Sequence, residues 1–203
     1  LFAYYWELFL GERVLSKLTD MRDEGLLAGF NEREFVEAIL GLFLHNDYHC
    51  GTLEELRDYL VKLQKMLQYE IHNFRILSKE KPEVDIKLSV STLTYGIPNV
   101  LHECAPYFKD RHILYLFDEY ENISEQQQQV IQTLLREKPT TCTIRIGTRP
   151  YGIRTYKTIR GIEENIEGSE FEMVHLDDEI RNSDHYKQFM EDICRSRLEG
   201  AGI

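Results

Sequence analysis

The amino-acid sequence predicts an α/β fold in which a layer of helices precedes a parallel sheet. Over residues 1–82 the apolar residues recur at the spacing of helix turns, which predicts a purely helical segment. From residue 83 onward, short apolar runs of strand length alternate with helical patterns. Because strands that alternate with helices usually pair in parallel through crossover connections, residues 83–203 are expected to form an α/β core.

Composition and charge disfavour several classes of protein. The hydrophobic share of 42% excludes intrinsic disorder as the main state. No apolar run approaches the roughly 20 residues needed to cross a bilayer, so no membrane contact is expected. The net charge of −11 argues against a grip on nucleic acid, which is expected only through regions outside this segment. The 4 scattered cysteines form no CxxC pair, which predicts free thiols and a cytoplasmic protein.

The helical segment contains three expected helices. An apolar stripe over residues 2–18 predicts the first, which should end within Asp20–Gly25. The segments Asn31–Glu34 and Thr52–Glu55 each place a capping residue three positions before a glutamate, which predicts the starts of the other two. A stop is expected at Lys81-Pro82, because proline disfavours a helical conformation in the residue before it.

Four strands and a short helix are expected next. Alternation over Asp85–Ser91 predicts a half-buried strand, and a short helix is expected after Pro98. The continuous apolar run Ile113–Phe117 is typical of a strand covered on both faces. Thr141–Gly147 and Phe171–Leu176 are the remaining predicted strands.

Two further helices complete the expected core. The segment Ser124–Gln127 has the capping-box pattern and predicts the start of the first. The low-complexity patch Gln126–Gln129 is expected on an exposed turn of that helix. Asp177 or Asp178 is expected to open a last helix with apolar residues over 186–193.

Two adjacent acids, Asp118 and Glu119, directly follow the apolar run Ile113–Phe117. In open parallel sheets, ligands bind beyond the carboxyl ends of the strands, so this pair is expected to face such a crevice. Asp118 is a candidate to hold Mg²⁺ through its water shell, because hard cations prefer oxygen ligands. Glu119 is a candidate to polarise an attacking water. The alternative is that both acids simply end a strand and begin a turn.

A hydroxyl and a guanidinium, those of Thr148 and Arg149, follow the next predicted strand. Neighbouring parallel strands end at the same edge of a sheet, so both side chains are expected on the edge that carries the two acids. There they could bind a γ-phosphate and report its loss. Alternatively, Arg149 forms a structural salt bridge with Glu119 or Glu121.

These motifs resemble those of a known family. Residues 116–122 (LFDEYEN) look like a Walker B motif, and residues 144–149 (IRIGTR) look like the sensor-1 strand of AAA+ and STAND-type P-loop ATPases. Over residues 85–198 the chain is similar to bacterial ATPases described as origin-recognition-complex-like. The resemblance implies a three-layer P-loop NTPase-like parallel sheet, incomplete here, behind an N-terminal helical layer.

The resemblance also implies binding of ATP and Mg²⁺, with water attacking the γ-phosphate. Asp118 would lie on the metal side, Glu119 would be the catalytic base, and Thr148 or Arg149 would sense the γ-phosphate. Arg154 is a further candidate, since arginines after a sensor strand can reach a neighbouring subunit's nucleotide. The output would be a conformational switch coupled to self-association or to other protein domains.

One expected motif is missing, because the chain contains no G-x-x-x-x-G-K-[ST] phosphate loop. In the family that it resembles, this loop precedes the Walker B strand, so it is expected before Leu1. Without the loop's backbone amides and lysine, phosphate affinity should be severely weakened, and these 203 residues alone are expected not to hydrolyse ATP. A domain that never had the loop is the alternative.

Three other interpretations remain open at this point. The first is a non-catalytic regulatory or protein-interaction domain that retains an ATPase-like scaffold. The second is a metal-dependent phosphodiesterase that uses the acids within Asp118–Glu121, although it would need a basic groove, which the net charge of −11 disfavours. The third is a zinc site, because His45 and His49 have the i,i+4 spacing of a helix and Cys50 follows them.

Overall fold

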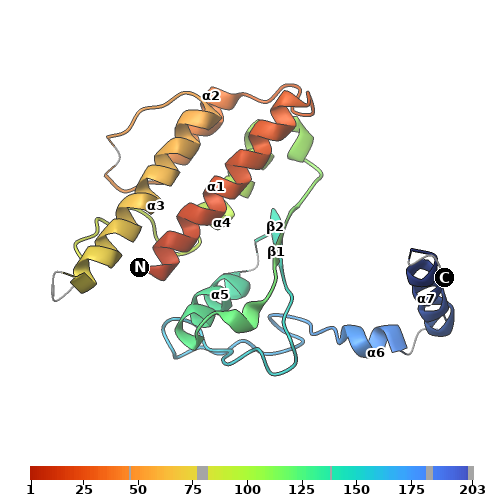
Figure 1. Ribbon diagram of the computed structural model, residues 1–203. Coiled ribbons are helices and arrows are strands. Elements are labelled where there is room, and N and C mark those ends of the chain that lie inside the picture. The colour runs from red at the N-terminus through yellow and green to blue at the C-terminus, as the bar shows by residue number, and fades with distance from the viewer. Residues whose placement is uncertain (46, 77–81, 138, 182–184, 201–203) are drawn as a thin grey trace. The chain divides into compact units, whose positions relative to one another are not determined.

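The computed structural model describes residues 1–45, 47–76, 82–137, 139–181 and 185–200. The chain divides into two compact units, Leu1–Asn165 and Ile166–Ile203. In the described part of the chain, the first unit contains helices α1 to α5 and a two-stranded sheet, and the second contains α6 and α7 (Figure 1). None of the helices in these ranges is long and apolar enough to cross a membrane.

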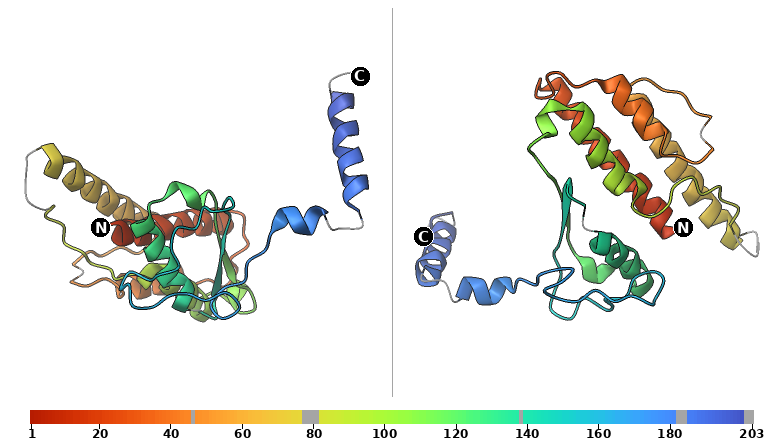
Figure 2. Two further views of the ribbon diagram at one scale, coloured as in Figure 1. Left: turned by 90° about the horizontal axis from the view of Figure 1, so that it is seen from below. Right: turned by 180° about the vertical axis from the view of Figure 1, so that it is seen from behind.

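The helical layer of the first unit consists of α1 (Phe2–Asp23), α2 (Glu32–Leu40), α3 (Leu53–Ile76) and α4 (Thr92–Cys104). Both α1 and α2 pack against α3 and α4. α4 lies behind α1 in Figure 1 and in front of it in the right-hand view of Figure 2. The three helices expected within residues 1–82 are confirmed. The layer's core is apolar, and its fully buried side chains include Leu8, Leu15, Phe35, Ile39, Leu56, Leu60, Leu93 and Ile97.

Side chains cap α2 and α3 where the sequence predicts it. The Asn31 side chain accepts the Glu34 N–H at 3.3 Å and donates to the Glu34 carboxylate at 3.0 Å. The Thr52 hydroxyl accepts the Glu55 N–H at 3.2 Å, and the Glu55 carboxylate accepts the N–H of Gly51 at 2.8 Å. These bonds satisfy N–H groups that a helix start would otherwise leave unpaired.

The segment between α3 and α4 differs from the prediction. Residue 81 of the stop predicted at Lys81-Pro82 lies outside the described residues. Asp85–Ser91 is not a strand, since among the described residues it pairs with no other strand. Leu88 is buried in the core of the helical layer, whereas Ile86 is 48% exposed. The alternation therefore does not mark one face of a sheet, since Leu88 packs in the helical core and Ile86 is largely exposed.

The short helix expected after Pro98 is present as the last part of α4, but α4 begins at Thr92, so Pro98 lies inside it and the predicted start is wrong. A proline in a helix leaves the carbonyl four residues earlier without its usual N–H partner. Here that carbonyl belongs to Thr94, and it accepts a hydrogen bond from the Tyr115 hydroxyl at 2.9 Å. A side chain from the sheet thus supplies the missing donor.

A buried carboxylate fixes the start of α4. Glu7 of α1 is 1% exposed and accepts the N–H groups of Ser91, Leu93 and Thr94 at 2.7, 2.7 and 2.9 Å. It also accepts the Thr94 hydroxyl at 2.9 Å. Burial raises the pKa of Glu7, although these hydrogen bonds oppose the shift. Because Ser91 provides no side-chain cap, Glu7 caps α4 from a different helix.

The sheet consists of β1 (Ile113–Phe117) and β2 (Cys142–Ile146), which confirms two of the predicted strands. They pair in parallel, with their first residues opposite each other and their last residues opposite each other. α5 (Glu125–Glu137) connects them. It begins with the predicted capping box, in which the Ser124 hydroxyl accepts the Gln127 N–H at 3.3 Å and the Gln127 side chain accepts the Ser124 N–H at 2.8 Å.

The described residues cover one face of this sheet. Tyr115 is 7% exposed on that face, and the Phe117 ring meets the Trp6 ring of α1 edge-on, with centroids 5.0 Å apart. On the opposite face, Leu114 and Leu116 are 46% and 70% exposed. The prediction that β1 is covered on both faces is therefore wrong for this structure. The observed fold is mostly helical with a two-stranded parallel sheet, consistent with part of a P-loop NTPase-like α/β fold rather than all three of its layers.

The second unit contains α6 (Leu176–Arg181) and α7 (Tyr186–Gly200). The strand predicted at Phe171–Leu176 is not formed, because its first residue makes one isolated bridge with Glu167 and its last residue begins α6. The last helix was expected to be continuous and is instead two helices. The residues between them, 182–184, lie outside the described residues.

Candidate functional site

The two candidate acids follow β1, and both are exposed. The Asp118 carboxylate accepts the Glu119 N–H at 2.8 Å, and the Glu119 carboxylate accepts the Asn122 side-chain amide at 2.9 Å. Glu119 has left-handed backbone angles, φ 55° and ψ 40°, which are uncommon and costly for a residue other than glycine. The chain therefore turns sharply at Glu119 into the 3₁₀ turn η2 (Tyr120–Asn122).

The ends of the two strands are joined through Gly147. Its N–H donates to the Phe117 carbonyl at 2.6 Å, and its carbonyl accepts the Tyr120 N–H at 3.2 Å. A Cβ atom on Gly147 would lie 2.7 Å from the Asp118 carboxylate oxygen, which is closer than real side chains approach. Glycine at this position therefore allows the Asp118 carboxylate to lie directly over the end of β2.

Glu121 connects the loop after β1 to the loop after β2. Its carboxylate accepts the Thr148 hydroxyl at 3.2 Å and the Arg149 N–H at 3.3 Å, and it pairs with the Arg149 guanidinium at 3.2 Å. The pKa of Glu121 is lowered, first by a hydrogen bond from its own N–H. The hydrogen bonds from the Arg149 N–H and from Thr148, and the charge of Arg149, act in the same direction. Of the two acids that the sequence left open as partners of Arg149, the structure pairs it with Glu121.

Arg154 binds the same turn through backbone carbonyls. Its guanidinium donates to the Glu121 carbonyl at 2.6 Å and to the Ile123 carbonyl. In this conformation the guanidinium holds the η2 turn of its own chain. A role for Arg154 in binding nucleotide, as the sequence suggests, stays a prediction.

The edge formed by these loops thus carries two exposed carboxylates on one strand end and a hydroxyl and a guanidinium on the next. A protein-family model described as ORC-CDC6-like matches residues 1–203. The chain belongs to the ORC-CDC6-like family. It is therefore an AAA+ ATPase-related protein, as its motifs suggested. No curated protein and no solved structure matches the chain significantly.

Members of the ORC-CDC6-like family typically bind ATP and Mg²⁺. Mg²⁺ usually takes one or two protein carboxylates and the phosphates of the substrate, and it keeps several of its waters. The exposed Asp118 carboxylate is a donor of the kind that Mg²⁺ takes when it arrives with a nucleotide.

Gln128 is a buried residue of this ORC-CDC6-like chain that its position in a polar run did not indicate. Gln128 is 0% exposed, so its assignment to an exposed turn was wrong, although Gln126 is exposed as expected. The side chain of Gln128 binds the backbone of both site loops. The available signal was helical spacing, because Gln128 lies three residues before the buried Ile131 and four before the buried Gln132.

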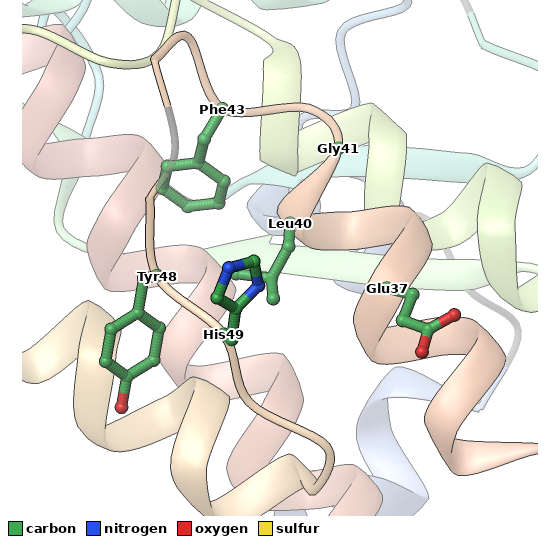
Figure 3. Close-up of a pocket in the computed structure, with 6 residues that line it drawn as sticks. All are labelled: Glu37, Leu40, Gly41, Phe43, Tyr48 and His49. Atoms are coloured by element: carbon green, nitrogen blue, oxygen red, sulfur yellow. The ribbon is translucent and has the colours of Figure 1, made fainter.

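The zinc hypothesis for His45, His49 and Cys50 gains no support. In the described part of the chain, no three His, Cys, Asp or Glu residues are grouped so that they could hold a metal ion. His45 and His49 lie in the connection between α2 and α3, not on a helix. His49 lines a shallow pocket of about 300 Å³ at the end of α2, with Glu37 and Tyr48 among the other lining residues (Figure 3).

Proposed function

We propose that this chain is the Walker B and sensor half of an ATP-binding and ATP-hydrolysing AAA+/STAND-type switch domain. The observation that carries the proposal is the joining of two neighbouring strand ends, one with Asp118 and Glu119 and the other with Thr148 and Arg149. A pair of acids beside a hydroxyl and a guanidinium supplies the metal-side and sensing groups for a Mg²⁺-bound triphosphate, although not the phosphate loop. Family membership supports the same class of protein.

Each residue has a separate task in this proposal. Asp118 holds Mg²⁺ through its water shell, and the metal neutralises charge on the phosphates when it is bound. Glu119 accepts a hydrogen bond from the attacking water and orients it for in-line attack on the γ-phosphate. Thr148 or Arg149 binds the γ-phosphate and loses this contact on hydrolysis.

Two features of the site favour this assignment of Glu119. Its carboxylate is exposed, and the Asn122 amide orients it at 2.9 Å. Its left-handed backbone is a costly conformation of the kind that clusters at functional sites.

The output of the proposed switch is a change in association. Nucleotide state would change the contacts between the two loops and so control self-association or contacts with other domains, with Arg154 reaching a neighbouring subunit.

The experiment compares ATP turnover by the complete gene product with that of Glu119→Gln. Loss of the general base should lower turnover by about 100-fold or more and leave ATP affinity nearly unchanged. Glu125→Gln is the matched control, because it removes the same charge from an exposed position at the start of α5. The complete gene product is used because these residues contain no phosphate loop. Equal turnover in wild type and Glu119→Gln would refute the catalytic assignment.

A non-catalytic domain that retains the ATPase-like scaffold is the second candidate. It is favoured by the ion pair of Arg149 with Glu121 and by the bonds of Arg154 to backbone carbonyls, which give both arginines structural partners. In this case Mg²⁺ would not promote ATP binding, and ATP would not be hydrolysed. Calorimetric titration of the complete gene product with ATP, with and without Mg²⁺, separates the two candidates.

A further inference from the structure

Gln128 of α5 is bonded to both of the loops that carry the candidate site. Its side-chain amide donates to the Tyr120 carbonyl at 3.2 Å and to the Gly152 carbonyl at 2.9 Å. Its side-chain oxygen accepts the Arg154 N–H at 2.8 Å. One amide group therefore uses both of its donor hydrogens and its acceptor on backbone groups that follow β1 and β2.

Burial makes two of these three bonds hard to replace. Gln128 is 0% exposed, and its partners Tyr120 and Gly152 are buried, so water does not reach their two carbonyls. The bond from the Arg154 N–H is partly buried. The Tyr120 hydroxyl also donates to the Gln128 carbonyl at 3.2 Å and accepts the Gln132 amide at 3.4 Å. A buried backbone group that loses its partner costs more than the bond itself contributed, because it also loses its solvation.

The loop held by Gln128 is packed closely against residues of the site. A Cβ atom on Gly152 would lie 2.2 Å from the Thr148 hydroxyl oxygen and 2.9 Å from the Glu121 Cβ. Gly152 is buried in this contact. A shift of Gly152 would therefore move Thr148 relative to Glu121.

We propose that Gln128 is a positioning residue that fixes the loops after β1 and β2 in one arrangement, and so sets the position of Thr148 and Arg149 relative to Glu119. The effect on catalysis rests on the ATPase function proposed above, whereas the effect on loop structure does not. Gln128 itself touches neither nucleotide nor water in this mechanism. It acts through the backbone of Tyr120, Gly152 and Arg154.

Hydrogen exchange tests the structural part in the complete gene product. Gln128→Met keeps the size of the side chain but removes its donors and acceptor, and Gln126→Met is the matched control from an exposed position of the same glutamine run. Peptides that cover residues 118–122 and 148–157 should exchange about tenfold faster in Gln128→Met than in the control. Peptides from α1 and α3 should not change. Equal exchange in both variants, or faster exchange throughout the chain, would overturn the proposal.

ATP turnover tests the catalytic part with the same pair of variants. A displaced site loop should lower kcat by about 10- to 100-fold, with a smaller change in KM, and Gln126→Met should match the wild type. Wild-type turnover in Gln128→Met would overturn the catalytic part. If the wild type itself does not hydrolyse ATP, the proposed function fails, and the exchange data still decide whether Gln128 positions the loops.

A second variant keeps the test decisive if Gln128→Met does not fold. Gln128→Glu retains the acceptor for the Arg154 N–H but, when ionised, has no hydrogen to donate to Tyr120 or Gly152. It should speed exchange in residues 118–122 and protect the Arg154 amide better than the shorter Gln128→Asn does. Protection unchanged across all of these variants contradicts the proposal.

Discussion

The helical layer and the site loops of the first unit are held together in different ways. The helical layer has a continuous apolar core, into which Glu7 introduces one buried carboxylate at the start of α4. The site loops are joined instead by the buried amide of Gln128. The polar network around it continues through the Tyr120 hydroxyl to the buried amides of Gln132 and Asn165. Apolar packing tolerates small shifts, whereas a hydrogen bond requires a defined distance and direction. The polar network therefore suits loops that must hold a site in one geometry.

The largest effect on the free energy of unfolding is expected at Glu7, the buried carboxylate in the otherwise apolar core of the helical layer. Glu7→Ala leaves three backbone N–H groups and the Thr94 hydroxyl without their acceptor. The free energy of unfolding should fall by about 3 kcal/mol, measured by urea dependence of hydrogen exchange in peptides from α1 and α4. The control Glu37→Ala breaks an exposed i,i+4 pair with Arg33 and should cost less than about 0.5 kcal/mol. Similar losses in both variants would show that Glu7 is not a cap.

The raised pKa of Glu7 fixes the direction of its pH dependence. Burial raises this pKa above its ordinary value of 4.5. Because the folded state then binds this proton more tightly than the unfolded state does, protonation of Glu7 adds to the free energy of unfolding. This contribution is fully present below pH 4.5 and is lost as the pH rises through the raised pKa. Relative to Glu7→Gln, which does not titrate, the wild type should lose stability over that interval. A difference that is constant with pH would contradict the raised pKa.

The smallest effect on stability is expected at the exposed end of the polar network. The Arg149 side chain is 84% exposed, and Glu121 keeps its bonds from Thr148 and from the Arg149 backbone when that side chain is removed. Arg149→Ala should change the free energy of unfolding by less than about 0.5 kcal/mol. If Arg149 senses the γ-phosphate, ATP turnover of the complete gene product should nevertheless fall by about 100-fold or more. Unchanged turnover would leave Arg149 with a structural role.

The same contrast explains how much of the molecule could be predicted from its sequence. Helical spacing predicted α1 to α3, and the apolar run Ile113–Phe117 and its neighbour predicted β1 and β2. The first half of α4 could not be predicted, because the carbonyl that the interior Pro98 leaves without its N–H partner is satisfied by the Tyr115 hydroxyl, which is distant in sequence. The strand expected at Asp85–Ser91 failed because alternation does not reveal whether a partner strand exists.

The positions of the site motifs could be predicted from the sequence, whereas the hydrogen bonds that hold the site loops could not. Motif spacing indicated that Asp118 and Arg149 belong to adjacent strand ends, and the structure joins those ends through Gly147 and Glu121. Helical spacing could indicate that Gln128 is buried, but its bonds could not be foreseen, because its partners are backbone groups of loops that the fold brings together. Directional polar contacts depend on tertiary structure, whereas apolar periodicity is local.

The most direct test of the central claim is to locate the nucleotide on the protein. Hydrogen exchange of the complete gene product is measured with and without ATP and Mg²⁺, using Glu119→Gln so that ATP is not consumed. The proposed site predicts slower exchange in peptides that cover residues 118–122 and 147–154, with no change in α2 and α3. Protection by ATP that is absent from both of these loops would contradict the claim that they form half of an ATP site.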